Sequence, residues 1–113
     1  MLFSKTVAGY HMLMILAAVD GKTSERELKV IRKYMSENFS DDIDFDVETE
    51  KVRNINPIDY PVHFNDAMNS FYLESTPEDR NHFLDFAVKL AIADKNVSPK
   101  ENLYLNELFT AWE

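Results

Sequence analysis

The sequence predicts a single all-α domain of about six helices, and three observations support this prediction. The chain has 113 residues, of which 45% are hydrophobic, enough for one core in a domain of this length. It contains two glycines, and its apolar residues recur mostly at helical spacing, with strand-like alternation only over residues 42–47. It has no cysteine, so disulfides and thiolate metal sites are excluded and a reducing, cytoplasmic location is expected.

The first helix is expected from Lys5 to Val19. Its central stretch, MLMILAAV, could imitate a signal peptide, but it has an internal counterpart, FAVKLAIA, near the other end of the chain, and we interpret it as a helix of the folded core. The run is too short to cross a bilayer, so no membrane span is expected. A second helix is expected from about residue 24 to about residue 38, with Leu28, Ile31 and Met35 on one face.

The acidic segment 41–50 allows two interpretations. Residues 42–47 alternate as an edge strand does. However, acids at positions 48 and 50 precede Lys51 and Arg53, which is the order that a helix macrodipole favours. We predict a short helix that begins at about Asp46. Its acids are interpreted first as a solvated helix face, and second as a site for a cation or a partner.

Three further helices complete the expected fold. The motif NPIDYP opens a helix that ends at about Glu74. Thr76 and Asp79 form a capping box at the start of the next helix, with Pro77 in its first turn. The last helix follows Pro99. The apolar stripes of these helices are Phe64, Ala67, Met68, Phe71 and Tyr72; Phe83, Phe86, Ala87 and Leu90; and Leu105, Leu108, Phe109 and Trp112. In the whole chain, the residues expected to be largely buried are Leu16, Leu28, Ile31, Phe86, Leu90, Leu105 and Trp112.

The chain contains an internal repeat, in which residues 12–35 align with residues 86–109. The identical pairs are Leu16 and Leu90, Ala17 and Ala91, Asp20 and Asp94, Ser24 and Ser98, and Glu27 and Glu101. We expect two helix–turn–helix units, residues 5–38 and 77–113, that pack about a pseudo-twofold axis. Connecting helices over residues 46–74 join them, so residues 1–113 form one domain.

The two turns of this repeat have a structural and a functional interpretation. Ser24 with Glu27, and the matching pair in the second copy, are capping boxes, which account for the serines and glutamates. Asp20 and Asp94 each close an apolar helix, where the macrodipole disfavours a carboxylate by about 0.3–1 kcal/mol. The structural interpretation is an Asx turn in each loop. The functional one is a cation held between the loops, and hard oxygen ligands favour Ca²⁺, Mg²⁺ or Mn²⁺. An EF-hand is excluded because Lys22 occupies its third loop position.

The segments LAAVDGKTSERELKVIRKYM and KLAIADKNVSPKENLYLNELF resemble the two hallmark motifs of the TerB (tellurite resistance) family. That family shares its all-helical fold with the N-terminal region of DjlA-type co-chaperones. The resemblance covers nearly the whole chain, although Lys95 stands where the family usually has glycine. It implies a non-enzymatic bacterial protein of stress response and tellurite resistance, with a cation-binding acidic surface. Carried over residue by residue, it implies the metal ligands Asp20, Glu27, Asp94 and Glu101.

The charge of the chain favours one class of partner over another. The net charge of −8 repels nucleic acid and anionic lipid, and it favours cations and proteins with a basic surface. No P-loop, nucleophile elbow, HExxH or dinucleotide motif occurs, so no catalytic role is expected. His11 is interpreted as a packed or half-exposed side chain, and His63 with Asp66 as a surface pair. The alternative function is a helical protein-interaction domain of co-chaperone type, in which the repeated acids serve only as caps.

Overall fold

The computed structural model of this chain describes residues 4–18, 25–39, 43–93 and 99–112, and these residues form helices without a strand. The elements are α1 (Lys5–Ala18), α2 (Glu25–Asn38), α3 (Phe45–Arg53), the 3₁₀ turn η1 (Pro57–Asp59), α4 (Tyr60–Glu74), α5 (Pro77–Ala93) and α6 (Pro99–Ala111). The all-α prediction is therefore confirmed. The radius of gyration is 12.6 Å, close to the value of about 13 Å expected for one globular domain of this length.

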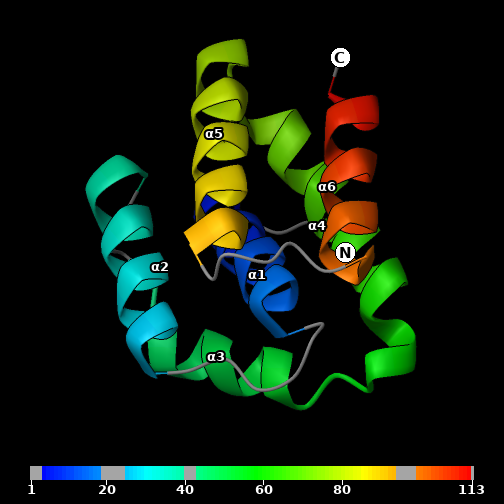
Figure 1. Cartoon of the computed structure of the whole chain (residues 1–113). Coiled ribbons are helices and arrows are strands. Elements are labelled where there is room, and N and C mark those ends of the chain that lie inside the picture. The colour runs from blue at the N-terminus through cyan, green and yellow to red at the C-terminus, as the bar shows by residue number, and fades with distance from the viewer. Residues whose placement is uncertain (1–3, 19–24, 40–42, 94–98, 113) are drawn as a thin grey trace.

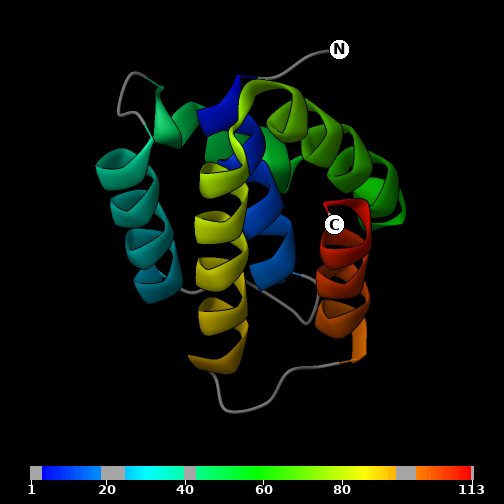
Figure 2. The same cartoon turned by 90° about the horizontal axis from the view of Figure 1, so that it is seen from above.

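Helix α1 lies at the centre of the molecule. Figures 1 and 2 show it surrounded by the other helices, and it contacts each of α2 to α6. Ten of its residues are buried, which explains why its sequence is apolar on every side. Gly9 allows this close packing, because a Cβ atom there would lie 2.7 Å from Met35 Cε and 3.1 Å from Phe83 Cε2. The helix is thus the core element around which the others assemble.

The predicted core is confirmed in part. Leu16, Leu28, Ile31 and Leu105 are buried, but Phe86, Leu90 and Trp112 are only partly buried. Tyr72 and Phe109, which were placed on buried stripes, are in fact 45% and 42% exposed. The reason is that α4, α5 and α6 lie around the outside of α1, so the edges of their apolar stripes face solvent.

Two helix starts explain how local sequence places the elements. Thr76 and Asp79 form the predicted reciprocal capping box, with N–O distances of 3.1 and 3.2 Å. The acidic segment forms a helix rather than a strand, and Asp44 caps it by accepting hydrogen bonds from the N–H groups of Asp46 and Val47.

The turns at 19–24 and 94–98, with the predicted caps Ser24 and Ser98, lie outside the described residues. In the part of the chain that is described, no helix has the length and apolar character needed to cross a membrane.

Candidate functional site

The predicted metal ligands are placed only in part. Asp20 and Asp94 lie outside the described residues. Glu27 is half-buried in the first turn of α2, and Glu101 belongs to the first turn of α6, where its side chain is not described. Among the described residues, no three His, Cys, Asp or Glu side chains are grouped so that they could hold a metal ion. The cation site at the repeated turns therefore stays a prediction.

A groove of about 680 Å³ lies between α4 and α6. Its lining residues are Pro61, Val62, Asn65, Met68, Leu103, Asn106, Glu107, Thr110 and Ala111. Met68 is 4% exposed, whereas Val62 and Leu103 are 66% and 64% exposed. The groove therefore has a buried apolar residue and two large aliphatic side chains that remain in contact with water.

The groove follows from the helical spacing of residues along α4 and α6. On α4, residues 62, 65 and 68 follow one another at intervals of three, and on α6 residues 103, 106 and 110 follow at intervals of three and four. Residues so spaced lie along one flank of a helix. Phe64 on α4 and Leu105 on α6 belong to the buried core-facing stripes and do not line the groove, whereas Met68 belongs to the α4 stripe and also lines the groove. A signal was present in the sequence, because Val62 and Leu103 are large aliphatic residues that fall outside the core stripes.

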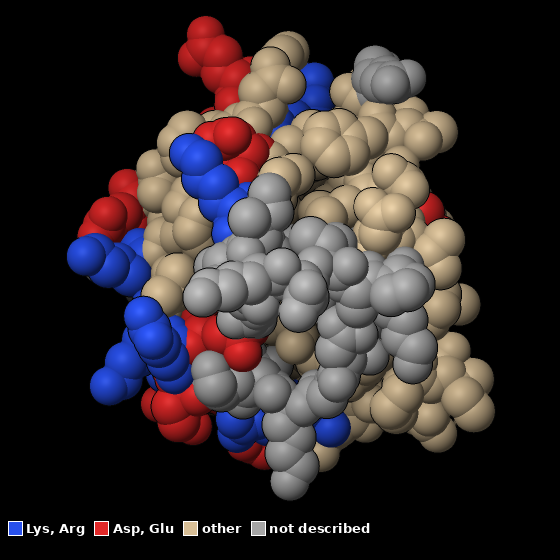
Figure 3. All heavy atoms as spheres, viewed as in Figure 1, with Lys and Arg blue, Asp and Glu red and all other residues tan. Residues whose placement is uncertain are grey.

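Charge is distributed unevenly around this groove. Glu107 is the charged residue among those that line it, and the other polar lining residues are amides and a threonine. Figure 3 shows uncharged side chains gathered over α6 and α4 on the right, whereas Lys, Arg, Asp and Glu gather on the left, over α2. The α4–α6 flank is thus the less charged side of a strongly acidic chain.

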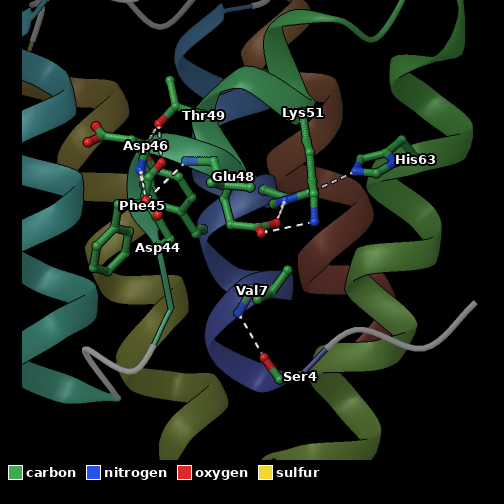
Figure 4. Close-up of polar contacts among 12 residues, drawn as sticks. Ser4, Val7, Asp44, Phe45, Asp46, Glu48, Thr49, Lys51 and His63 are labelled. Atoms are coloured by element: carbon green, nitrogen blue, oxygen red, sulfur yellow. Dashed lines mark hydrogen bonds and ion pairs between the residues drawn. The ribbon is translucent and has the colours of Figure 1, made fainter.

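A second arrangement of polar groups joins α1, α3 and α4. His11 is 1% exposed. Its Nε2 lies 2.8 Å from Oε1 of Glu48, and its Nδ1 lies 2.8 Å from Nε2 of His63. Lys51 Nζ reaches the other Glu48 oxygen at 3.1 Å. Figure 4 shows Glu48 and Lys51 directed toward each other from α3, with His63 on the neighbouring α4. The interpretation of His63 as half of a surface pair is corrected, because its ring faces a buried histidine.

The electrostatic environment of this cluster follows from burial and from its own charges. Burial lowers the pKa of His11, and the charges of His63 and Lys51 lower it further, while the hydrogen bond to Glu48 opposes the change. Burial also lowers the pKa of His63, against the opposing effect of Asp66. Burial alone would raise the pKa of Glu48, but hydrogen bonds from His11 and Lys51 and their charges bring it below its usual value. Near neutral pH the cluster is therefore a carboxylate with two uncharged imidazoles.

A neighbouring network ties α3 to α1 and α2. The hydroxyl of Thr49 lies 2.5 Å from the hydroxyl of Tyr10 and donates to the carbonyl of Phe45 at 2.7 Å. Arg32 of α2 donates to the same Thr49 oxygen at 3.1 Å and pairs with Asp46 at 3.0 Å. These contacts satisfy the polar groups under α3 and hold this short helix in place, so we assign them to structure.

Sequence reasoning did not find the buried cluster. Its members are 37 and 52 residues apart in the chain, and no local motif connects them. Comparison of the chain with protein-family models, with curated proteins and with solved structures gives no match in any of the three. The resemblance to the TerB family therefore stays a prediction from the sequence motifs.

Proposed function

We propose that this chain is a non-enzymatic helical protein-binding domain, and that the α4–α6 groove holds an amphipathic helix of a partner protein. One observation carries the proposal: Val62 and Leu103 stand exposed on the two walls of a groove that also contains buried Met68. Large exposed aliphatic side chains that converge on a concave surface mark binding sites more often than scattered ones do.

The shape of the groove supports a helical occupant. Two helices form its walls, and their lining residues repeat at helical spacing along each wall. A partner helix can lay aliphatic side chains at positions i, i+3, i+4 and i+7 into such a groove.

Charge supports a basic partner. Glu107 stands at the groove, and the whole chain carries a net charge of −8. A partner helix with Lys or Arg outside its aliphatic face would be attracted by Glu107 and by the negative charge of the whole chain, and an acidic one would be repelled. We therefore commit to an amphipathic helix with an aliphatic face and basic flanks.

The test uses synthetic peptides, because the partner is unidentified. One peptide of about eighteen residues carries leucines at helical spacing and lysines on the opposite face, and a second has the same composition in scrambled order. We expect the ordered peptide to bind and the scrambled one to bind at least about tenfold more weakly, as measured by fluorescence anisotropy. Replacing lysine by glutamate in the ordered peptide should also abolish binding, because charge then opposes association.

A matched pair of variants places the peptide on the groove. Leu103→Asp changes an exposed wall residue, and Leu73→Asp changes a residue of α4 that is 71% exposed and does not line the groove. We expect Leu103→Asp to weaken binding by about tenfold or more and Leu73→Asp to leave it unchanged. Equal affinity of both variants would refute the groove as the site. Self-association of the parent that Leu103→Asp abolishes would instead identify a second copy of this chain as the occupant.

A cation-binding function at the repeated turns, associated with stress response and tellurite resistance, is a second proposal. One observation favours it, which is that a helix ends before each repeated turn and another begins after it. Helix α1 ends at Ala18 and α2 starts at Glu25, and α5 ends at Ala93 and α6 starts at Pro99. Asp20, Glu27, Asp94 and Glu101 would supply carboxylate ligands to Ca²⁺, Mg²⁺ or Mn²⁺. This function and the groove use different residues, so one can fail without the other.

A further inference from the structure

The contact between the two histidine rings limits how many protons they can hold. The Nδ1 atom of His11 and the Nε2 atom of His63 are 2.8 Å apart, and the ring planes are inclined by 26°. A hydrogen bond at this distance needs one hydrogen between the two nitrogens. With Glu48 ionised, His11 donates through Nε2, and its Nδ1 accepts from His63. The hydrogen bonds of His11 to Glu48 and to His63 are therefore both formed when the two rings are uncharged.

One additional proton fits this arrangement, but two do not. A single imidazolium on either ring still leaves one hydrogen between the facing nitrogens, and the charge is balanced by Glu48. When both rings are protonated, both nitrogens carry hydrogen, and two N–H groups with like charge face each other at 2.8 Å. The rings must then separate. The two histidines consequently titrate as a coupled pair rather than as independent groups.

Among the described residues, the charged groups that shift the pKa values of the pair come from two helices. Glu48 and Lys51 face His11 from α3, where the carboxylate favours the first proton and the ammonium opposes it. Asp66, on the same helix as His63, favours a charge on that ring. Glu48 also interacts with Lys51, so its negative charge is shared between two cations once His11 is protonated. These groups balance one proton on the pair and not a second.

The helix that carries His63 also forms one wall of the groove. His63 faces α1, whereas its neighbours Val62 and Asn65 line the groove on the other side of α4. Because α4 carries both His63 and Val62, a displacement of α4 away from α1 would also move that wall of the groove. We propose that the His11–His63 pair is a proton-operated switch, which keeps the groove closed around a partner helix until uptake of a second proton moves α4 and releases the partner. This proposal rests on the proposed function of the groove, because it names the regulation of the same site.

The first experiment tests the switch without any partner. The side-chain nitrogens of the histidines are followed by NMR from about pH 7.5 to about pH 5. We expect two separate protonation steps for His11 and His63, the second displaced by more than one pH unit. Independent titration of His11 and His63 with superimposable curves would overturn the shared-proton geometry.

The movement of α4 is measured in the same pH range. Because the chain has no cysteine, Asn69→Cys on α4 and Val47→Cys on α3 give the double variant two unique sites for spin labels. We expect the label distance to increase on acidification in the parent sequence and to stay constant when His63→Gln is added. Glutamine can place an N–H donor near the position of Nε2 but cannot take up a proton in this range. An unchanged distance in the parent would show that the rings do not move the helix.

Peptide binding then connects the switch to the groove. Affinity for the ordered lysine–leucine peptide should fall by about tenfold or more between about pH 7.5 and pH 5 in the parent, and by less than about threefold in His63→Gln. His82→Gln, which removes a histidine that contacts Tyr34 instead, should behave as the parent. Equal pH dependence of the three proteins would refute the switch. Absence of peptide binding at neutral pH would refute the groove while the NMR and distance results still stand on their own.

Discussion

The ring of Tyr34 on α2 stacks on the ring of Phe86 on α5, with centroids 3.7 Å apart and planes inclined by 5°. The Tyr34 hydroxyl also lies 2.8 Å from Nδ1 of His82, one turn earlier on α5. These contacts join α2 to α5, which belong to opposite halves of the predicted repeat. The partly buried rim of the core is therefore held by a specific ring contact as well as by burial.

The first prediction concerns this stack. Phe86→Ala should lower the free energy of unfolding by about 2–4 kcal/mol, because it removes a large ring that is partly buried against Tyr34. Phe109→Ala removes the same side chain at a position that is 42% exposed, and we expect it to cost less than about 1 kcal/mol. Urea unfolding of both variants measures the difference. Equal losses would mean that the stack adds nothing to ordinary burial.

The second prediction concerns the cap of α5. Thr76→Ala should destabilise the protein by about 0.5–2 kcal/mol, since its hydroxyl accepts the N–H of Asp79 at 3.1 Å. Ser36→Ala serves as the control, because Ser36 is exposed and its hydroxyl contacts only a carbonyl of its own helix at 3.4 Å among the contacts described. Thermal melting shows whether the cap contributes. The same measurement on Ser24→Ala and Ser98→Ala tests the two predicted caps outside the described residues, where a similar loss is expected.

The third prediction concerns stability at mildly acidic pH. The pKa values of His11 and His63 lie below the ordinary value of 6.5, so the unfolded chain binds more protons than the folded chain just below that pH. Stability should therefore be complete above about pH 6.5 and decrease as the pH falls. The lowered pKa values of Glu48 and Asp79 add a further loss only below their ordinary values of 4.5 and 3.8.

The histidine contribution to this profile is separable by substitution. His63→Gln should flatten the decrease between about pH 6.5 and pH 5 while leaving the loss below pH 4.5 intact. The measurement is the urea midpoint at a series of pH values. A variant whose profile coincides with that of the parent would show that the buried pair does not govern acid stability.

The fourth prediction concerns the repeated acids. If Asp20 and Asp94 share a cation, Asp20→Asn and Asp94→Asn should each weaken binding by about tenfold or more, because a ligand charge is lost. We expect the larger effect at Asp20, whose turn contains the Asp-Gly pair. Asp46→Asn, at a highly exposed side chain in the acidic segment, should leave affinity unchanged. Calorimetric titration with Ca²⁺, Mg²⁺ and Mn²⁺ decides the matter, and a parent protein without saturable heat would exclude this site.

Local sequence determined where the helices lie. The capping box at Thr76, the acids that precede Lys51 and the apolar run of α1 each act within a few residues, so the helix bounds could be predicted closely. The same reasoning found buried core positions such as Ile31 and Leu105. It placed Phe109 wrongly, because helical spacing identifies a stripe but not how much of that stripe a neighbour covers.

Tertiary packing alone decided what lies between the helices. The repeat suggested equivalent halves, yet α1 is surrounded by five helices while α5 buries only Phe83 and Ala87 among its residues with described exposure. The contact of His11 with Glu48 and His63 spans 37 and 52 residues, and the groove needs one flank of α4 beside one flank of α6. Helical periodicity is a property of neighbours in the chain, whereas these sites depend on which helix faces which, and that choice is made by the packing of the whole core around α1.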